Sequence, residues 1–219
     1  MTAANPLPDP LPLRFSKLLF DKFLVLILWV VIGPFFLVIL ATLWLERCVA
    51  TRDKRPLFLV DFRVTQGRVF PLYKFCVFKK QVLDTLEEEG VFLQTKALEQ
   101  NRSNMTFVGY ILQRFYLDEL PQLWNILRGD MSFVGPRPWN VLDYEAEVSM
   151  GIYRKRLVRA GLVGLVQINK GRWETRSHQS VFDDEYIACY RSYPWWRLLG
   201  LDCWVLWKSC YVVFRAEGL

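Results

Sequence analysis

The chain has 219 residues, of which 53% are hydrophobic, 16% aromatic and 23% charged. This composition excludes a disordered chain, which has few aromatic residues, and a bundle of several membrane spans, which carries less charge. The length suits one domain with an attached segment. The formal net charge is +6. An apolar and a basic excess in the same chain indicate a protein at an anionic membrane surface.

The N-terminal part of the chain predicts a tail followed by a membrane segment. Residues 1–17 begin with a proline-rich run and are expected to lack regular structure. Within the predicted membrane segment, 18–46, the 23 residues Phe23–Leu45 carry no charge. As a straight helix they would be roughly 34 Å long, enough to cross a hydrocarbon core of about 30 Å. Gly33-Pro34 interrupts this run, and an internal proline kinks a helix.

Basic residues flank the apolar run on both sides, namely Arg14, Lys17, Lys22, Arg47, Arg52, Lys54 and Arg55. The positive-inside rule would hold both ends on the cytoplasmic side. A re-entrant helix that enters, bends at Pro34 and leaves by the same face satisfies both flanks. A plain kinked span with its N-terminus outside is the alternative that hydropathy leaves open. A cleaved signal peptide is disfavoured, because the run is too long and lacks an A-x-A site.

Residues 47–219 predict one compact α/β body that is mainly helical. Two β-prone runs, Phe58–Phe62 and Val69–Phe78, are joined through a turn at Gln66-Gly67. Val163–Ile168 is a further predicted strand. Apolar spacing predicts helices over Leu83–Leu98 with a break near Gly90, Leu117–Leu127 with a stop at Gly129, Val141–Val158, and Phe182–Tyr190.

The C-terminal stretch, about 195–214, is dense in Trp, Leu and Val but contains Arg197, Asp202 and Lys208. Charges near its centre disfavour a membrane span. Because Trp and Tyr favour the headgroup level, an interfacial helix lying in the membrane plane is predicted. A buried core helix is the alternative.

Cysteine and histidine patterns argue against the common metal and triad chemistries. The five cysteines are scattered without a C-x-x-C pair, so neither a zinc site nor a disulfide framework is predicted, and reduced thiols fit the cytoplasm. The single histidine, His178, lies in a polar run and is expected to be a solvated loop residue. One histidine makes a Ser-His-Asp triad improbable. The chemistry must therefore use carboxylates, lysines and arginines, with room for a hard metal.

Asp118 and Glu119 stand at the start of a leucine-patterned helix, with Pro121 in its first turn. Adjacent carboxylates repel each other, so a cation is expected beside them. Mg²⁺ commonly binds through one or two carboxylates plus substrate phosphates. An ionised Asp near a phosphate could attack phosphorus and form an acyl phosphate. A simple N-cap role for Asp118 is the alternative.

The loop Gly135-Pro136-Arg137-Pro138 holds a guanidinium between two prolines. Such a stiff Arg can grip phosphate oxygens in a fork. Further basic residues that would strengthen the positive field are Lys74, Arg114, Arg128 and Arg172. The glycine-rich signatures of P-loop and Rossmann nucleotide sites are missing.

The segment LDELPQLWNILRGDMSFVGPRP, residues 117–138, resembles the hallmark of the bacterial sugar transferases, the monotopic phosphoglycosyl transferases. Weaker similarity links Arg63–Phe75 to the family segment that ends in Lys-Phe-Arg. Arg156–Arg172 is similar to the family's Pro-Gly-(Ile/Leu)-(Thr/Val)-Gly-x-x-Gln region. The apolar run with Pro34 resembles the family's re-entrant membrane helix.

The resemblance implies a monotopic enzyme of the bacterial inner membrane, with a catalytic domain on the cytoplasmic face and amphipathic interfacial helices. Such enzymes transfer a sugar 1-phosphate from a nucleoside-diphosphate sugar, usually a UDP-sugar, to a polyprenyl phosphate such as undecaprenyl phosphate. They release UMP by a ping-pong mechanism and begin the assembly of membrane-associated glycans such as exopolysaccharide, O-antigen, capsule or glycoprotein.

The resemblance also assigns roles to residues. Asp118 would attack the β-phosphate to give a phosphosugar-enzyme, and Glu119 would help it hold Mg²⁺. Arg137 would bind phosphate, and Gln167 falls in the nucleotide-side loop. A later family carboxylate corresponds to Asp184 or Glu185. The full predicted substrate-binding set is Arg137, Arg114, Lys74, Gln167, Arg172, Asp184 and Glu185.

Four positions depart from the family pattern: Gln113 and Cys76 replace arginines, Tyr116 replaces a common Ser, and Ala160 replaces a Pro. Since the acidic pair is intact, an active enzyme with a modified substrate pocket is expected. The alternative is a non-catalytic module that binds anionic lipid through the basic cluster Arg154–Arg159. A nucleic-acid partner is not expected, because the aromatic residues form no base-stacking pattern.

Overall fold

The computed structural model describes residues 7–49, 55–89, 98, 101–169 and 176–214. This part of the chain is mostly helical. Its helices are α1 (Phe15–Val49), α2 (Lys80–Glu89), η1 (Arg102–Asn104), α4 (Phe107–Arg114), η2 (Leu117–Glu119), α5 (Gln122–Arg128), α6 (Val141–Ser149), α7 (Arg154–Leu157), α8 (Leu165–Ile168), α9 (Arg176–Ser192) and α10 (Trp195–Phe214). Its strands are β1 (Phe58–Thr65), β2 (Arg68–Phe75), β3 (Ser132–Val134), β4 (Trp139–Asn140) and β5 (Gly161–Val163).

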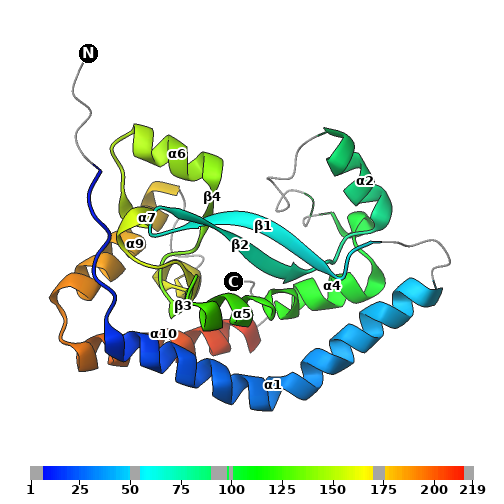
Figure 1. The fold of residues 1–219 in the computed structure, drawn as a ribbon, viewed down its shortest axis with the longest axis horizontal. Helices are drawn as coiled ribbons and strands as arrows, with labels where there is room; N and C mark the ends of the chain where they lie inside the picture. Colours follow the sequence, from blue (N-terminus) through cyan, green and yellow to red (C-terminus); the bar gives the residue numbers. More distant parts are fainter. Residues whose placement is uncertain (1–6, 50–54, 90–97, 99–100, 170–175, 215–219) are drawn as a thin grey trace.

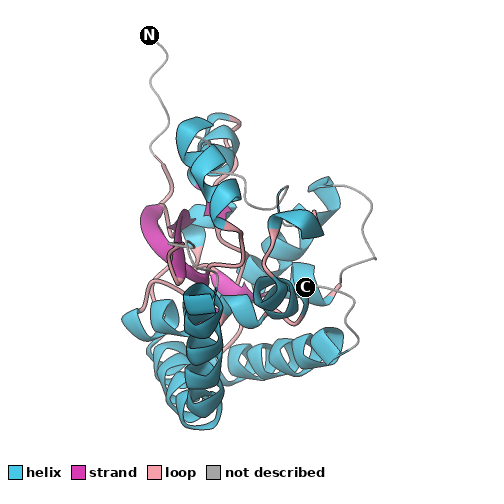
Figure 2. Ribbon diagram, turned by 90° about the vertical axis from the view of Figure 1, so that its right-hand side faces the viewer, coloured by secondary structure: helices cyan, strands magenta, loops and turns pink. Residues whose placement is uncertain are grey.

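A twisted antiparallel ribbon of β1 and β2 lies above the helices that hold the acidic pair. β4 adds to the free edge of β1, and β3 pairs with β5 in a separate parallel sheet. Beneath the ribbon run α4 and α5, and α1 and α10 form the base (Figure 1). Seen from the side, the ribbon again lies above the long helices (Figure 2). The predicted hairpin is confirmed, and both residues of its turn, Gln66 and Gly67, have the positive φ of a tight hairpin turn.

The buried side chain of Asn125 joins α5 to the ribbon. Its Oδ1 accepts a hydrogen bond of 3.2 Å from the backbone nitrogen of Tyr73, and its Nδ2 donates one of 2.7 Å to the carbonyl of Pro71. An amide side chain thus pairs with the outer edge of β2 as a further strand would. This pairing fixes the ribbon over the segment that carries Asp118 and Glu119.

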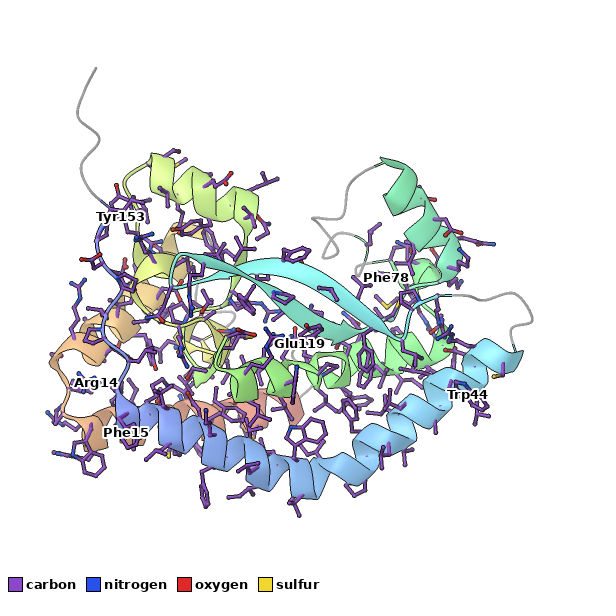
Figure 3. All side chains as sticks on the ribbon, viewed as in Figure 1. Arg14, Phe15, Trp44, Phe78, Glu119 and Tyr153 are labelled. Atoms are coloured by element: carbon purple, nitrogen blue, oxygen red, sulfur yellow. The ribbon has the colours of Figure 1, made fainter. Side chains whose placement is uncertain are left out.

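Helix α1 carries a long apolar surface along the base of the fold. Among the described residues it is the helix long and apolar enough to cross a membrane. Most of its apolar side chains are exposed, Val30 to 79%, while Val25 and Leu43 are buried. The helix contains Pro34 and bends in its middle (Figure 1), and Phe15 and Trp44 lie toward its two ends (Figure 3). So much exposed apolar surface indicates association with a membrane.

Helix α10 has two different faces. Leu198, Asp202, Val205 and Ser209 are buried at helical spacing. The exposed aromatic side chains are Trp195, Trp196, Trp204, Trp207 and Tyr211. One face of this helix is therefore buried, as in the buried-helix alternative, and its interfacial position stays a prediction that the exposed aromatic face would suit.

Two predicted elements are wrong. The single helix predicted over Val141–Val158 ends at Ser149, because Gly151 takes a left-handed conformation that stops α6, and α7 follows as a separate turn. The strand predicted over Val163–Ile168 is mostly helix α8, preceded by the short strand β5. A short apolar run of this kind does not distinguish strand from helix.

The helix predicted over Leu117–Leu127 is divided into η2 and α5. Tyr116 precedes η2, and Pro121 occupies the position before α5, so Asp118 lies inside a turn and is not an N-cap. His178 lies in α9 and not in a loop. The predicted break near Gly90 falls outside the described residues.

The described part of the N-terminal tail, residues 7–14, has no helix or strand, but it is held against the body. The backbone nitrogen of Leu11 donates to the carbonyl of Leu157 at 2.8 Å, and Arg156 donates to the carbonyl of Pro8 at 2.7 Å. Helix α1 begins at Phe15, three residues before the predicted boundary at 18.

Candidate active site

The acidic pair lies in η2, which is one turn of 3-10 helix. Tyr116, directly before this turn, has a φ of 56°, which is uncommon for a residue other than glycine. Strained backbone of this kind often occurs at functional sites. The turn buries both carboxylate residues, leaving Asp118 5% and Glu119 8% exposed. Two buried, adjacent carboxylates require compensating charge.

Two cations compensate the charge of Glu119. A guanidinium nitrogen of Arg137 lies 2.9 Å from Oε1 of Glu119, and Nζ of Lys74 lies 3.6 Å from the same atom. Burial alone would raise the pKa of Glu119, but Arg137 and then Lys74 bring this pKa below its ordinary value. Glu119 lies under the ribbon, where β2 passes over η2 and α5 (Figure 3). An ionised Glu119 therefore fixes both cations at the site.

The loop that carries Arg137 is held rigidly by the neighbouring strand. The backbone nitrogen of Gly135 donates to the carbonyl of Val163 at 3.0 Å, and that of Gly161 donates to the carbonyl of Pro136 at 2.9 Å. A Cβ atom on Gly161 would lie only 2.1 Å from the backbone nitrogen of Gly135. Glycine is therefore required for this approach, which sets where Arg137 enters the site.

Gln167 is buried beside this loop. Both its Oε1 and its Nε2 atoms lack a hydrogen-bond partner, and the side chain is 4% exposed. A Cβ built on Gly164 would lie 3.1 Å from Oε1 of Gln167 and 2.4 Å from the carbonyl oxygen of Gly135. Buried amides are normally satisfied, so this one has donor and acceptor capacity for a ligand.

Other predicted binding residues have different surroundings. Arg114 is exposed on α4 and donates to the hydroxyl of Tyr110 at 3.3 Å. Asp184 is exposed on α9 and pairs with Arg154 at 3.4 Å, and Glu185 beside it is exposed. The predicted residue Arg172 lies outside the described residues. The structure thus brings Lys74, Asp118, Glu119 and Arg137 together, while Arg114 and Asp184 pair elsewhere.

Asp61 on β1 is a residue that the sequence patterns did not indicate. It lines a small cavity together with Lys74 and Asp118. The available signal was an acidic residue in the middle of an otherwise β-prone run. Without the register of the ribbon, however, the sequence does not show that this position faces η2.

The carboxylates of this site suit Mg²⁺ in its usual binding mode. Over the described ranges, no group of three or more His, Cys, Asp and Glu side chains could hold a metal. Mg²⁺ usually keeps several waters and binds one or two carboxylates plus substrate phosphates, so it does not need such a cage. The adjacent carboxylates of Asp118 and Glu119 meet that requirement, and Asp118 also lines the small cavity.

The buried acid–base cluster, the rigid Arg137 loop and the exposed apolar helix α1 define a membrane-associated protein with a site suited to phosphate groups. The sequence model of the family described as "Bacterial sugar transferase" matches residues 13–216 of the chain. The chain therefore belongs to the bacterial sugar transferase family, whose members transfer sugar phosphates.

Several relatives have described functions. The chain is 30% identical to the undecaprenyl-phosphate galactose phosphotransferase of Salmonella typhimurium, over 94% of this chain and 42% of that protein. It is 32% identical to the exopolysaccharide production protein ExoY of Rhizobium meliloti, over 93% of this chain and 87% of that protein. It is 38% identical to the UDP-glucose:undecaprenyl-phosphate glucose-1-phosphate transferase of Escherichia coli, over 58% of this chain and 28% of that protein. The chain thus spans less than half of the first and third of these proteins and most of the second.

Proposed function

We propose that this protein transfers a sugar 1-phosphate from a UDP-sugar to a polyprenyl phosphate, such as undecaprenyl phosphate, and releases UMP. The single observation that carries this proposal is the buried Asp118–Glu119 turn, in which Arg137 and Lys74 form ion pairs with Glu119. The names of the relatives support the two substrates. The product would begin the assembly of a membrane-associated glycan.

The reaction proceeds in two displacements at phosphorus. In the first, a carboxylate oxygen of Asp118 attacks the β-phosphorus, and the bond from that phosphorus to the bridging oxygen breaks. UMP leaves with the bridging oxygen, and the sugar phosphate remains on Asp118. In the second, a phosphate oxygen of the polyprenyl phosphate attacks the same phosphorus, and the carboxylate of Asp118 is released. Two such displacements give ping-pong kinetics.

The surrounding residues bind and orient the phosphates. A guanidinium has five N–H donors, so Arg137 can bond Glu119 and a phosphate oxygen at the same time. Lys74 adds positive charge on the side of the ribbon, and Gln167 offers its amide to the nucleotide. Asp118 and Glu119 supply the carboxylate oxygens predicted for Mg²⁺. The metal would neutralise charge on the diphosphate when bound.

A direct test follows UMP release by purified protein in detergent with Mg²⁺, polyprenyl phosphate and a panel of UDP-sugars. We expect release with at least one sugar, and about one UMP per protein when the polyprenyl phosphate is omitted. Asp118→Asn should abolish both signals, while Asp84→Asn, on half-exposed Asp84 of α2, should retain them. No release with any sugar, or full activity in Asp118→Asn, would favour a non-catalytic lipid-binding module.

We also propose that α1 enters the inner membrane and returns to the cytoplasmic face, where the catalytic body lies. Support comes from the basic flanks, the internal Pro34 and the bend of α1 (Figure 1). Exposed Cys48 lies at the C-terminal end of this helix. An impermeant maleimide added to intact cells should label neither Cys48 nor an Asp9→Cys variant. Labelling of position 9 alone would show a plain span.

A further inference from the structure

Asp21 is a buried acidic residue on the apolar helix α1. It lies two residues before the uncharged run Phe23–Leu45 and is only 4% exposed. Lys17 and Val25, about one helical turn to either side, are also buried, so this face of α1 packs against the body. A carboxylate in such a place is costly unless hydrogen bonds satisfy it.

Both carboxylate oxygens of Asp21 bond consecutive residues of β3, which passes above the N-terminal half of α1 (Figure 1). The Oδ2 atom accepts a hydrogen bond of 2.7 Å from the hydroxyl of Ser132, and the Oδ1 atom accepts one of 3.3 Å from the backbone nitrogen of Phe133. Hydrogen bonds to a charged carboxylate are about twice as strong as those between neutral groups. Asp21 therefore ties β3 firmly to α1.

Asp21 binds the edge of β3 that lies away from β5. Over the described ranges, β5 is the one strand that pairs with β3. On that side the backbone nitrogen of Ser132 donates to the carbonyl of Ala160 at 2.9 Å. Because successive N–H groups of a strand point to opposite edges, that of Phe133 points away from β5, where Asp21 accepts it. The strand is thus held between β5 and the carboxylate of Asp21.

Strand β3 continues directly into the loop Gly135-Pro136-Arg137-Pro138. Each of the two prolines fixes a backbone dihedral angle, so a shift of β3 is passed on to Arg137 and is not absorbed within the loop. The guanidinium of Arg137 bonds Glu119 and must reach a substrate phosphate at the same time. A misplacement of about 1 Å in such a group can cost about a hundredfold in rate.

We propose that Asp21 is a positioning residue for the transfer reaction. By holding β3, it sets where the guanidinium of Arg137 meets the phosphates. This inference rests on the proposed function, because it concerns the same site. The apolar helix α1 then has a role besides membrane attachment, since one of its side chains determines the geometry of the site.

The test compares UMP release by Asp21→Asn with that by the unaltered full-length protein in detergent. Asparagine keeps the size of the side chain but loses the charge and one of the two acceptor oxygens, so we expect kcat to fall by about ten- to hundredfold. The KM for the UDP-sugar should change by less than about threefold, because no group that contacts the substrate is removed. Melting curves give the temperature range in which each variant is folded.

Glu46→Gln is the matched control on the same helix. Glu46 lies near the other end of α1, where it pairs with Arg55 and accepts a hydrogen bond of 3.4 Å from the backbone nitrogen of Val108. Its replacement loosens α1 from the body without touching β3, so stability should fall while kcat stays within about twofold of the unaltered value. Equal losses of kcat in Glu46→Gln and Asp21→Asn would overturn the assignment, because the general seating of α1 would then explain both.

A double-variant cycle with Arg137→Lys separates positioning from stability. If Asp21 acts through Arg137, Asp21→Asn should lower kcat by less than about twofold once position 137 is lysine. A merely structural residue would lower kcat by the same factor in both backgrounds, and that result would contradict the proposal.

Ser132→Ala removes one of the two bonds of Asp21 from the side of β3, and it carries the same test if Asp21→Asn does not fold. Unchanged kcat in Asp21→Asn and Ser132→Ala would refute this inference and leave the proposed function intact. Absence of UMP release by the unaltered protein with every sugar would instead refute the proposed function.

Discussion

The Nζ atom of Lys17 lies 2.6 Å from Oδ2 of Asp202, with both residues buried. This ion pair joins the start of α1 to the middle of α10. The hydroxyl of Tyr186 lies 3.0 Å from the other oxygen of Asp202 and 3.0 Å from the carbonyl of Val134. Val134 is the last residue before the Arg137 loop. The apolar helix and the site loop are therefore connected through one buried polar network.

Asp21 makes a second connection between α1 and the same strand. The hydroxyl of Ser132 donates to Oδ2 of Asp21 at 2.7 Å, and the backbone nitrogen of Phe133 donates to Oδ1 at 3.3 Å. Asp21 thus bonds β3 directly, and Asp202 is linked to Val134 of β3 through Tyr186. The position of α1 thus affects the position of the strand from which the phosphate-binding loop begins.

Removing Lys17 should destabilise the fold strongly. Lys17→Met leaves Asp202 buried without its cation, and we expect a loss of about 3–5 kcal/mol in unfolding free energy. The double variant Lys17→Met with Asp202→Leu should recover much of this loss, because neither charge of the pair remains. Denaturant unfolding in detergent measures both. Lys80→Ala, at a partly exposed pair on α2, is the control and should change stability by no more than about 1 kcal/mol. A strictly additive double variant would contradict the coupling.

The pH dependence of stability should show the ionised state of Glu119. Its pKa is lowered in the folded protein, so its contribution is fully present above its unfolded pKa of about 4.3 and is lost as pH falls through the folded pKa. The difference in melting temperature between the unaltered protein and Glu119→Gln should be constant above about pH 5 and shrink at lower pH. A difference that grows on acidification would mean that Glu119 is stabilised in its neutral form.

The sequence predicted the membrane helix, the hairpin and the acidic pair, but not how the pair is held. Periodicity and hallmark residues locate Asp118, Glu119 and Arg137, because these signals are local. Asp61 lines the small cavity beside Asp118 only because of the register of two strands. The Lys17–Asp202 pair joins residues 185 positions apart. Neither relationship leaves a local pattern.

The same limit explains the wrong elements. The hydrophobic pattern continues through Gly151, and only the left-handed conformation there ends the helix. Two further predictions placed residues at the site: the resemblance suggested Asp184 or Glu185, and the pattern of basic residues suggested Arg114. In the structure the partner of Asp184 is Arg154 and that of Arg114 is Tyr110.

Replacing Gly161 by alanine should move the Arg137 loop. The new Cβ would meet backbone atoms of Gly135, which cannot move aside as a flexible side chain would. We expect a loss of about 1–3 kcal/mol in stability from overpacking, together with weaker UMP release. Gly200→Ala on α10 is a matched control, because nothing lies within 4 Å of its Cβ position. That change should be neutral or stabilising by up to about 1 kcal/mol. Equal effects of the two substitutions would show that close approach at Gly161 is unimportant.

Replacing Gln167 by methionine should separate stability from substrate binding. Because neither polar atom of Gln167 has a partner, an apolar side chain of similar length should leave the fold as stable or make it more stable. The KM for the UDP-sugar should rise by about three- to tenfold, the equivalent of one lost hydrogen bond. Asn125→Leu is the contrasting change, since that amide bonds both Tyr73 and Pro71 and its loss should cost about 1–3 kcal/mol. Melting curves and UMP-release kinetics measure both properties. If Gln167→Met lowered stability and left KM unchanged, Gln167 would be a structural residue, and the proposal that it binds the nucleotide would be wrong.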